Sequence, residues 1–141
     1  MKEVCAAIVK IDNKFILQLR DFNPKISEPG RWGLLSGEVK KNEKIEDCLV
    51  REIKEEIDFL TKNFKKKFSF FYKKDNSNMH IFQILDLNKV PSRIYEGQEL
   101  GLFTQKEIEK DMLFSVKNKK YMNGAKLLKK VIRKFETSNL K

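Results

Sequence analysis

The sequence predicts one domain of the α/β (α+β) class, spanning residues 1–141, and three observations support this. A length of 141 residues suits a single domain that buries its own core, and neither repeats nor linker composition divide it. Several short segments, rich in β-branched and aromatic residues and bounded by turn residues, indicate strands. Two longer segments, in the middle and at the end of the chain, have helical spacing of apolar residues.

The composition is that of a globular protein with a basic surface. Charged residues make up 35% and aromatic residues 11% of the chain, a balance that excludes a disordered polymer. The formal net charge of +10 suits a polyanionic ligand such as a nucleotide, a phosphorylated metabolite or RNA. A lysine-rich surface that serves only solubility explains this charge equally well.

The localisation signals favour the cytoplasm. The apolar run within residues 1–12 is too short for a signal peptide, and no segment is long enough to span a membrane. Cys5 and Cys48 have no CxxC partner, which favours a reducing compartment. We therefore expect a cytoplasmic protein with no membrane partner.

The first half of the chain begins with two predicted strands. Residues 4–11 and residues 14–20 have strand composition, and Asp12 and Asn13 form the turn between them. Residues 21–30 contain both Pro and Gly and show no periodicity, so we expect a loop there.

A charged helix is predicted around residues 51–56. Glu52, Glu55 and Glu56 follow i, i+3 and i+4 spacing, so their side chains project from one narrow arc. Like charges at this spacing destabilise a helix. Mg²⁺ prefers oxygen ligands and works beside substrate phosphates, so a bound cation would remove that cost. A solvated acidic face fits the same residues, and the spacing alone leaves both interpretations open.

The segment from residue 37 to residue 59 resembles the Nudix box, G-x5-E-x7-R-E-U-x-E-E-x-G-U, in which U is a bulky aliphatic residue. The matching positions are Gly37, Glu43, Arg51, Glu52, Ile53, Glu55 and Glu56, with Phe59 at the last bulky position. Asp58 replaces the late glycine of the family, which adopts a left-handed conformation after the helix. Asp tolerates that conformation better than most residues but less well than Gly, so we expect strain or a shifted loop there.

The preceding segment, residues 30–37 (GRWGLLSG), is similar to the family's G-x-W-x-x-P-G-G entry into the box. Leu35 and Ser36 replace the Pro and the first Gly of that ending. The family uses this turn to bring a backbone carbonyl to the metal, and Gly37 keeps that candidate role. Trp32 either anchors the core, which we favour, or binds substrate by stacking on a base.

The resemblance implies both a fold and a chemistry. The fold is an α/β/α sandwich with a mixed β-sheet, in which the box forms a loop–helix–loop. The reaction is hydrolysis of a nucleoside diphosphate linked to another group X, with Mg²⁺ or Mn²⁺ required. Glu52, Glu55 and Glu56 would hold the metal, and Glu43 would pair with Arg51 as a structural support.

Two further roles follow from the resemblance. The arginine that closes the second strand of the family faces the substrate cleft, which makes Arg20 a candidate substrate contact. Many relatives place one more glutamate late in the chain, as a second metal ligand or as the base. Glu99, within residues 93–103, is our first choice for this catalytic residue, and Glu96 is the second. The proton of the attacking water would pass to Glu52 or Glu99.

In the second half of the chain, residues 63–74 alternate lysines with Phe and Tyr. This pattern occurs in segments that bind single-stranded nucleic acid and in half-buried strands. We favour a strand, because residues 79–87 supply a partner for it. The aromatic side chains expected to face inward are Phe64, Phe68, Phe70 and Tyr72. His80 has no nearby Cys or His, so we interpret it as a strand residue.

Two helices are predicted towards the C-terminus. Thr104 and Glu107 have the spacing of a capping box, which predicts a short helix at residues 105–110. Residues 121–135 have the pattern of an amphipathic helix. Its apolar positions are Tyr121, Ala125, Leu128, Ile132 and Phe135.

Three functional classes fit the sequence. The first is a hydrolase of small-molecule nucleotides, with a nucleoside triphosphate or an oxidised one as the favoured substrate. Nucleotide sugars and the 5′ pyrophosphate of RNA are the alternative substrates. The second class is a non-catalytic module of the same fold that binds nucleotide or RNA, and the intact carboxylates argue against it. The third is a basic RNA-binding domain, supported only by charge and by residues 63–74. Family members are often dimers, so a homodimer stays open.

Overall fold

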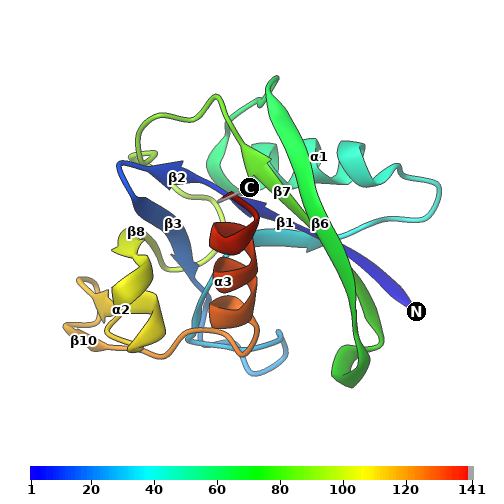
Figure 1. Ribbon diagram of the computed structural model, residues 1–141. Coiled ribbons are helices and arrows are strands. Elements are labelled where there is room, and N and C mark those ends of the chain that lie inside the picture. The colour runs from blue at the N-terminus through cyan, green and yellow to red at the C-terminus, as the bar shows by residue number, and fades with distance from the viewer. Residues whose placement is uncertain (140–141) are drawn as a thin grey trace.

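The computed structural model, which describes residues 1–139, is built on two β-sheets (Figure 1). The first sheet has four strands in the order β5-β1-β7-β6. Their bounds are β1 Lys2–Ile8, β5 Leu35–Glu38, β6 Phe64–Tyr72 and β7 Ser77–Ile84. β1 and β7 run parallel while the other neighbours are antiparallel, so the sheet is mixed, as the resemblance implied.

The second sheet is arranged around β3, which pairs antiparallel with β2, β4 and β8. The bounds are β2 Lys10–Ile11, β3 Lys14–Leu19, β4 Trp32–Gly33 and β8 Glu99–Thr104. A separate hairpin joins β9 (Phe114–Ser115) to β10 (Lys120–Tyr121).

The first predicted pair of strands is confirmed, with one refinement. Residues 4–11 belong to two strands, β1 and β2, because the chain changes its pairing from the first sheet to the second after Ile8. Asp12 and Asn13 form the turn, with φ of 49° and 64°. Asn and Asp enter this left-handed region more readily than other residues that carry a side chain, which explains their place in the hairpin.

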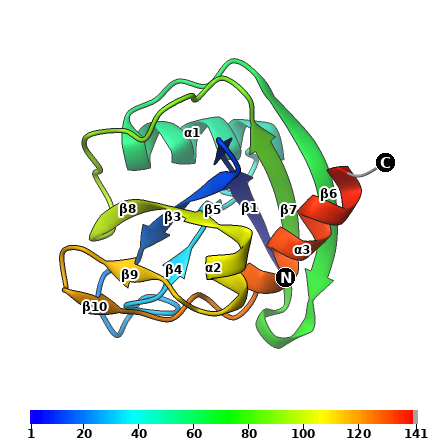
Figure 2. The ribbon, with the colours of Figure 1, turned by 60° about the vertical axis from the view of Figure 1, so that its left-hand side comes forward.

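Helices cover both faces of the sheets, so the fold is the expected α/β/α sandwich (Figure 2). The helices are α1 Ile45–Ile57, α2 Gln105–Glu109 and α3 Leu128–Asn139, and a 3-10 turn, η1, spans Lys73–Asp75. α1 packs on one side of the strands, and α2 and α3 pack on the other. None of the helices within residues 1–139 has the length and apolar character that crossing a membrane requires.

Alternation along β1 divides the core into two clusters. Cys5 and Ala7 belong to the cluster under α1, whereas Ala6 and Ile8 belong to the cluster under α3. Successive side chains of a strand point to opposite faces, so a strand covered on both sides is apolar throughout. The helical side chains that complete the two clusters are Leu49, Ile53 and Ile57 from α1, and Leu128, Val131, Ile132 and Phe135 from α3.

Strand β6 confirms the strand prediction for residues 63–74, and its aromatic residues serve both clusters. A bulge between Lys66 and Phe68 inserts one extra residue into the strand. Phe64 therefore packs with the cluster under α1, while Phe68 and Phe70 pack with the cluster under α3. His80 lies in β7, as predicted, and its Nε2 is 3.0 Å from a carboxylate oxygen of Glu3.

The predicted helix over residues 121–135 is wrong in its first half. α3 begins only at Leu128, and Tyr121 lies in β10 with 60% of its surface exposed. The intervening backbone pairs with Trp32, whose N–H donates to the carbonyl of Asn123 (2.9 Å) and whose carbonyl accepts from Ala125 (2.7 Å). These bonds hold the segment against β4, and a helix would need the same backbone groups for its own bonds.

The short helix α2 begins at the predicted capping box. The hydroxyl of Thr104 accepts a hydrogen bond of 3.1 Å from the N–H of Glu107, and the carboxylate of Glu107 accepts one of 2.9 Å from the N–H of Thr104. Both helix predictions near the C-terminus are thus confirmed in type, but the second helix starts later than predicted, at Leu128, and ends later, at Asn139.

Candidate active site

Helix α1 carries the central carboxylates, and local sequence explains its start and its buried face. Glu46 and Asp47 lie in the first turn, where the helix dipole favours negative charge. Ile53 and Ile57 are buried against the sheet, which fixes the rotation of the helix about its axis. That rotation turns the acidic arc of the helix towards β5.

Asp58 ends α1 in the conformation for which the family uses glycine. Its φ of 53° and ψ of 40° lie in the left-handed region, and its N–H donates to the carbonyl of Lys54 at 3.0 Å. The carboxylate of Asp58 also pairs with the ammonium group of Lys54. The helix therefore ends as a glycine-capped helix does, and the replacement adds only the strain of a side chain in this region.

Three carboxylates converge beside the C-terminal half of α1. Glu52, Glu56 and Glu96 each offer an oxygen atom, and these atoms all lie within 4.8 Å of one another. Glu52 and Glu56 are one helical turn apart, and Glu96 comes from the loop before β8. We call these three residues the carboxylate cluster.

The two glutamates near the start of β8, Glu96 and Glu99, differ in whether their carboxylates reach the cluster. The structure brings our second choice, Glu96, into the cluster, while our first choice, Glu99, lies outside it. Its carboxylate accepts hydrogen bonds from the hydroxyl of Ser115 and, at 3.3 Å, from the N–H of Lys117. Glu99 thus holds the β9–β10 hairpin, because its place in β8 directs its side chain there. The second choice, Glu96, occupies the place foreseen for the extra glutamate.

Glu55 lies beside the carboxylate cluster but is not part of it. Its side chain is 44% exposed and accepts hydrogen bonds of 3.3 and 3.5 Å from Nη1 of Arg51. Glu52, Glu55 and Glu56 therefore share one face of the helix, as the sequence predicted. Of these three, only Glu52 and Glu56 place their carboxylates in the cluster.

Gly37 makes room for Glu52. A Cβ atom at Gly37 would coincide with the side chain of Glu52, so only glycine lets the carboxylate lie against β5. The side chain of Glu52 is 12% exposed in this position. Gly37 pairs with Cys5 of β1, which fixes the strand that forms this floor.

The predicted pair of Arg51 and Glu43 is present as a two-pronged ion pair. Nε of Arg51 is 2.8 Å from one oxygen of Glu43, and Nη2 is 2.9 Å from the other. The hydrogen bonds from Arg51 lower the pKa of Glu43 to about 2. Nη1 of the same guanidinium lies 2.7 Å from Glu52. Arg51 therefore links the loop before the helix to the carboxylate cluster.

Glu56 is the most buried carboxylate of the cluster. It is 3% exposed, and its Oε2 atom has no hydrogen-bond partner. Burial, followed by the charges of Glu52 and Glu96, raises the pKa of Glu56 to about 9. Burial is also the main cause of the raised pKa of Glu52.

These observations match what a hard divalent cation requires. A buried carboxylate oxygen without a partner is costly, and it lies here beside two further carboxylates. Oxygen donors are the ligands that Mg²⁺ and similar ions take in proteins, and a cation would stabilise all three charges. The carboxylate cluster therefore fits a divalent metal ion.

A cleft of about 530 Å³ lies next to the cluster, on the other side of β5. Gly37 lines this cleft and also lies under Glu52, so the two sites share one strand. The apolar side chains of the lining are those of Val4, Ala6, Leu34, Met79, Ile81, Ala125, Leu127, Leu128 and Val131. The polar lining includes Lys2, Tyr72, Lys74, Asp75 and Lys126.

Arg20 lines the cleft, as the resemblance implied. It follows β3 directly, and its Nε donates a hydrogen bond of 2.7 Å to the carbonyl of Ser27. Its positive charge acts on Glu56 and lowers the pKa of that group, against the larger effect of burial. Arg20 thus lines the cleft and lies near enough to the carboxylate cluster for its charge to act on Glu56.

Trp32 lies in the core, which is the interpretation that we favoured. The alternative, in which Trp32 binds substrate by stacking on a base, is wrong. The side chain is fully buried. Its Nε1 donates to the carbonyl of Leu113 at 3.2 Å, and its ring packs edge-on against Phe103 with centroids 4.8 Å apart. A ring enclosed in this way has no free face for a base.

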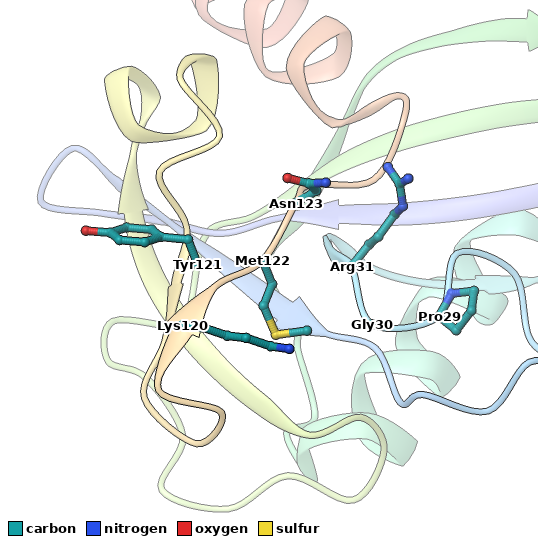
Figure 3. A pocket seen from close by; sticks show the side chains of 7 residues that line it. All are labelled: Pro29, Gly30, Arg31, Lys120, Tyr121, Met122 and Asn123. Atoms are coloured by element: carbon teal, nitrogen blue, oxygen red, sulfur yellow. The ribbon is translucent and has the colours of Figure 1, made fainter.

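A second, smaller hollow of about 290 Å³ lies between residues 29–31 and residues 120–123 (Figure 3). Arg31 and Lys120 give it a basic character. Its lining shares no residue with the cleft or with β5, so we leave it out of the candidate active site.

Sequence reasoning missed the residues that line the cleft, apart from Arg20 and Gly37. Tyr72, Lys74 and Lys126 come from distant segments, and each resembles an ordinary surface residue in the sequence. It also missed Gln18, which is 4% exposed. A single polar residue among the apolar positions of residues 14–20 was the available signal, because a buried amide requires a partner.

The comparisons with known proteins agree with this geometry. A family model described as NUDIX domain matches residues 1–122. No curated protein matches the sequence significantly. Among solved structures, a MutT protein from Methanosarcina mazei has a TM-score of 0.75 and 17% identity, covering 99% of this chain and 96% of that one.

Two further structures support the same conclusion. The NUDIX domain of NrtR from Shewanella oneidensis, complexed with ADP ribose, has a TM-score of 0.73 and 14% identity over 99% of this chain and 88% of its own. The ORF135 protein of E. coli has a TM-score of 0.63 and 25% identity over 77% of this chain and 78% of its own. With the family model matching most of the sequence, the chain belongs to the NUDIX domain family and is a Nudix hydrolase.

Proposed function

We propose that the protein is a Mg²⁺- or Mn²⁺-dependent pyrophosphohydrolase that cleaves the diphosphate of a nucleoside diphosphate linked to a group X. The observation that carries this proposal is the convergence of Glu52, Glu56 and Glu96 within 4.8 Å, with an unpartnered oxygen on Glu56. A non-catalytic module has no need of three carboxylates that repel one another in a half-buried position.

Each residue of the site has a role in this proposal. Glu52, Glu56 and Glu96 hold the metal, with Glu55 and the carbonyl of Gly37 beside them as further oxygen donors. When bound, the metal lowers the pKa of a water molecule and neutralises charge on the diphosphate. Arg51, 2.7 Å from Glu52, keeps that carboxylate in place.

The chain's own residues also supply the proton acceptor and a phosphate contact. Glu96 is the exposed member of the carboxylate cluster, so one of its two oxygens can hold the metal while the other, open to water, accepts the proton of the attacking water. Arg20 lines the cleft and its charge acts on Glu56, so its guanidinium is a candidate to bind phosphate oxygens. Glu99, which is held by Ser115, has no part in the reaction.

The nucleoside or the group X occupies the cleft. A volume of about 530 Å³ lies within the usual range of small-molecule sites, and its lining combines apolar side chains with a few polar ones. The basic residues of the lining outnumber the acidic ones by one, which suits an anionic ligand; they are Lys2, Arg20, Lys74 and Lys126 against Glu28, Glu38 and Asp75. β5 is the edge strand of its sheet and its Gly37 borders both the cleft and Glu52, so we place the substrate across this edge, from the cleft to the cluster.

A nucleoside triphosphate, oxidised or not, is the substrate class we favour. Compounds that join two groups through a diphosphate are the next class, because the structurally similar NrtR domain is complexed with ADP ribose. Nucleotide sugars and the 5′ pyrophosphate of RNA are further candidate substrates. All of these present a diphosphate to the carboxylate cluster and differ only in what the cleft must hold.

We also treat residues 1–141 as one domain. The family model ends at residue 122, yet α3 follows it and buries Leu128, Ile132 and Phe135 in the same cluster as Trp32. This shared core supports a unit that includes the C-terminal helix.

A product assay tests the proposed function. Nucleoside triphosphates, oxidised nucleoside triphosphates, nucleotide sugars, dinucleoside polyphosphates, ADP-ribose and RNA with a 5′ triphosphate are incubated with the protein and Mg²⁺. Hydrolysis of a diphosphate bond that disappears in Glu56→Gln supports the proposal. No hydrolysis of any compound, together with metal-independent nucleotide binding, favours the non-catalytic module.

A further inference from the structure

We propose that Gln18 is a positioning residue that holds the carboxylate of Glu96 in the cluster, an inference that rests on the proposed function. Gln18 lies in β3 and is 4% exposed. Its Nε2 donates a hydrogen bond of 2.8 Å to the backbone carbonyl of Glu96. This bond joins residues that are 78 positions apart in the chain.

The amide of Gln18 occupies a position that otherwise suits an apolar side chain. Ile16, two residues earlier on the same face of β3, is buried in the cluster under α1. Burying an amide among such residues costs free energy unless it forms hydrogen bonds. The hydrogen bond to the carbonyl of Glu96 offsets this cost. The buried position of the Gln18 side chain and the position of the loop therefore depend on each other.

The loop that carries Glu96 is fixed on both sides of that residue. On one side, the N–H of Tyr95 donates to the carbonyl of Glu56 at 2.9 Å. On the other side, the N–H of Gln98 donates to the carbonyl of Leu19 at 2.8 Å. Glu96 itself is tied through its carbonyl to Gln18.

Gly97 shows how closely the loop approaches β3. Its φ is +81°, and a Cβ atom there would lie 2.8 Å from the carbonyl oxygen of Leu19 and 2.9 Å from Cγ of Gln18. Glycine is therefore required for the loop to pass over Gln18. The contact is a packed one, and it leaves the loop little freedom to slide along the strand.

The loop needs this hydrogen bond because the negative charges of the cluster repel the carboxylate of Glu96. Glu96 is exposed and its carboxylate lies within 4.8 Å of those of Glu52 and Glu56. Like charges repel at this distance, and an exposed loop can yield to that repulsion by moving outwards. The hydrogen bond from Gln18 resists this movement in the protein before a cation is bound.

Gln18 acts through Glu96 and not on the substrate, since its amide is engaged with the backbone. Gln18→Met keeps the length of the side chain and removes the donor. Gln83→Met makes the same change in β7 and is the matched control. The primary measurement is calorimetric binding of Mn²⁺ alone, without substrate, to the wild-type protein and to each variant.

Gln18→Met should bind Mn²⁺ more weakly by roughly ten- to a hundredfold, the scale of residues that orient metal ligands. Gln83→Met should bind as the wild type does. Glu96→Gln should also bind weakly, and adding Gln18→Met to it should cause no further loss, because both changes act on one carboxylate. Unchanged Mn²⁺ binding in Gln18→Met, or fully additive losses, overturns the inference.

Gly97→Ala is the second variant, in case Gln18→Met does not fold. Its added Cβ atom would clash with Leu19 and Gln18, so it should displace the same loop and weaken Mn²⁺ binding in the wild-type background but not in Glu96→Gln. Unchanged binding in Gly97→Ala overturns the inference as well. If the wild-type protein itself binds no Mn²⁺, the proposed function fails, and that result is distinct from every outcome above.

Discussion

The side chain of Glu52 fills the space in which a Cβ atom of residue 37 would lie, so Gly37 and Glu52 are packed as one unit. Gly37→Ala must displace Glu52 from the carboxylate cluster. We expect Mn²⁺ binding and hydrolysis to fall by roughly ten- to a hundredfold.

Gly33→Ala is the control for this change. A Cβ atom at Gly33 would meet only the Cβ of Ala125, at an ordinary 3.7 Å. Mn²⁺ binding should therefore stay close to wild type, as measured by calorimetry. Equal losses in both variants would contradict the role assigned to Gly37.

Glu56→Gln separates a metal site from an acidic surface. Without metal, the variant should be at least as stable as the wild type, because Gln keeps the shape of the side chain and does not need the proton that the buried Glu56 retains in the folded state. Added Mg²⁺ should stabilise the wild type by mass action and the variant much less. Hydrolysis should fall by roughly a hundredfold or more.

Thermal melts with and without Mg²⁺ measure these differences. Glu46→Gln changes an exposed glutamate in the first turn of the same helix and is the matched control. If the two variants behaved alike in stability, metal response and activity, the metal-site interpretation would be lost.

Stability of the metal-free protein should depend on pH through Glu56. Its pKa is raised to about 9 in the folded protein from an ordinary 4.5. Between these values the folded state keeps a proton that the unfolded chain has released, so the free energy of unfolding falls as pH rises. Chelator-treated protein should melt at a lower temperature near about pH 8.5 than near about pH 5.5.

Glu56→Gln should flatten most of this dependence, and saturating Mg²⁺ should do the same in the wild type. A small residual slope of the same sign is expected from Glu52, whose pKa is also raised by burial. A melting temperature that rose with pH over this range would reverse the predicted sign.

Asp58→Gly should stabilise the protein by at most about 1 kcal/mol, because Asp58 has φ of 53° and glycine relieves that strain. The lost pair with Lys54 subtracts little, since both side chains are 54% exposed. Urea denaturation measures the difference. Asp58→Ala, which loses the pair and keeps the strain, should be less stable than the wild type, and a clear loss in Asp58→Gly would show that Asp58 makes a needed contact of its own.

Binding of single-stranded RNA should be weak and should disappear near physiological salt. The ammonium groups of Lys130 and Lys134 lie 4.9 to 5.9 Å from the ring centroids of Phe68 and Phe70, so lysine stems cover the rings on which bases would stack. Fluorescence anisotropy with a labelled RNA at increasing salt measures this. Tight binding at physiological salt would favour the RNA-binding class, and preference for mononucleotides in Mg²⁺ supports the hydrolase.

Sequence reasoning succeeded where the relevant contacts are local. The i, i+4 relation of Glu52 and Glu56 follows from the geometry of a helix, and Asp58 was expected at a left-handed position from its place in the box. The pair of Arg51 and Glu43 spans a single short loop and was likewise predicted.

The failures occur where a distant segment decides the outcome. Glu96 and Glu99 are three residues apart, and the choice between them depends on β8 pairing Glu99 with Leu19 across the second sheet. The start of α3 depends on hydrogen bonds between Trp32 and residues 123–125. Neither pairing has a signal in the local sequence, so periodicity alone extended the helix too far.

The bulge in β6 affects how readily two molecules of the protein pair along this strand. β6 is the last strand of its sheet, nine residues long and rich in Phe, which is the kind of edge that invites pairing between molecules. Lys65 and Lys66 precede the bulge, and both an irregular strand and charged side chains oppose intermolecular β-sheet growth. The same extra residue that lets one strand serve two cores thus also protects the protein from aggregation along that edge.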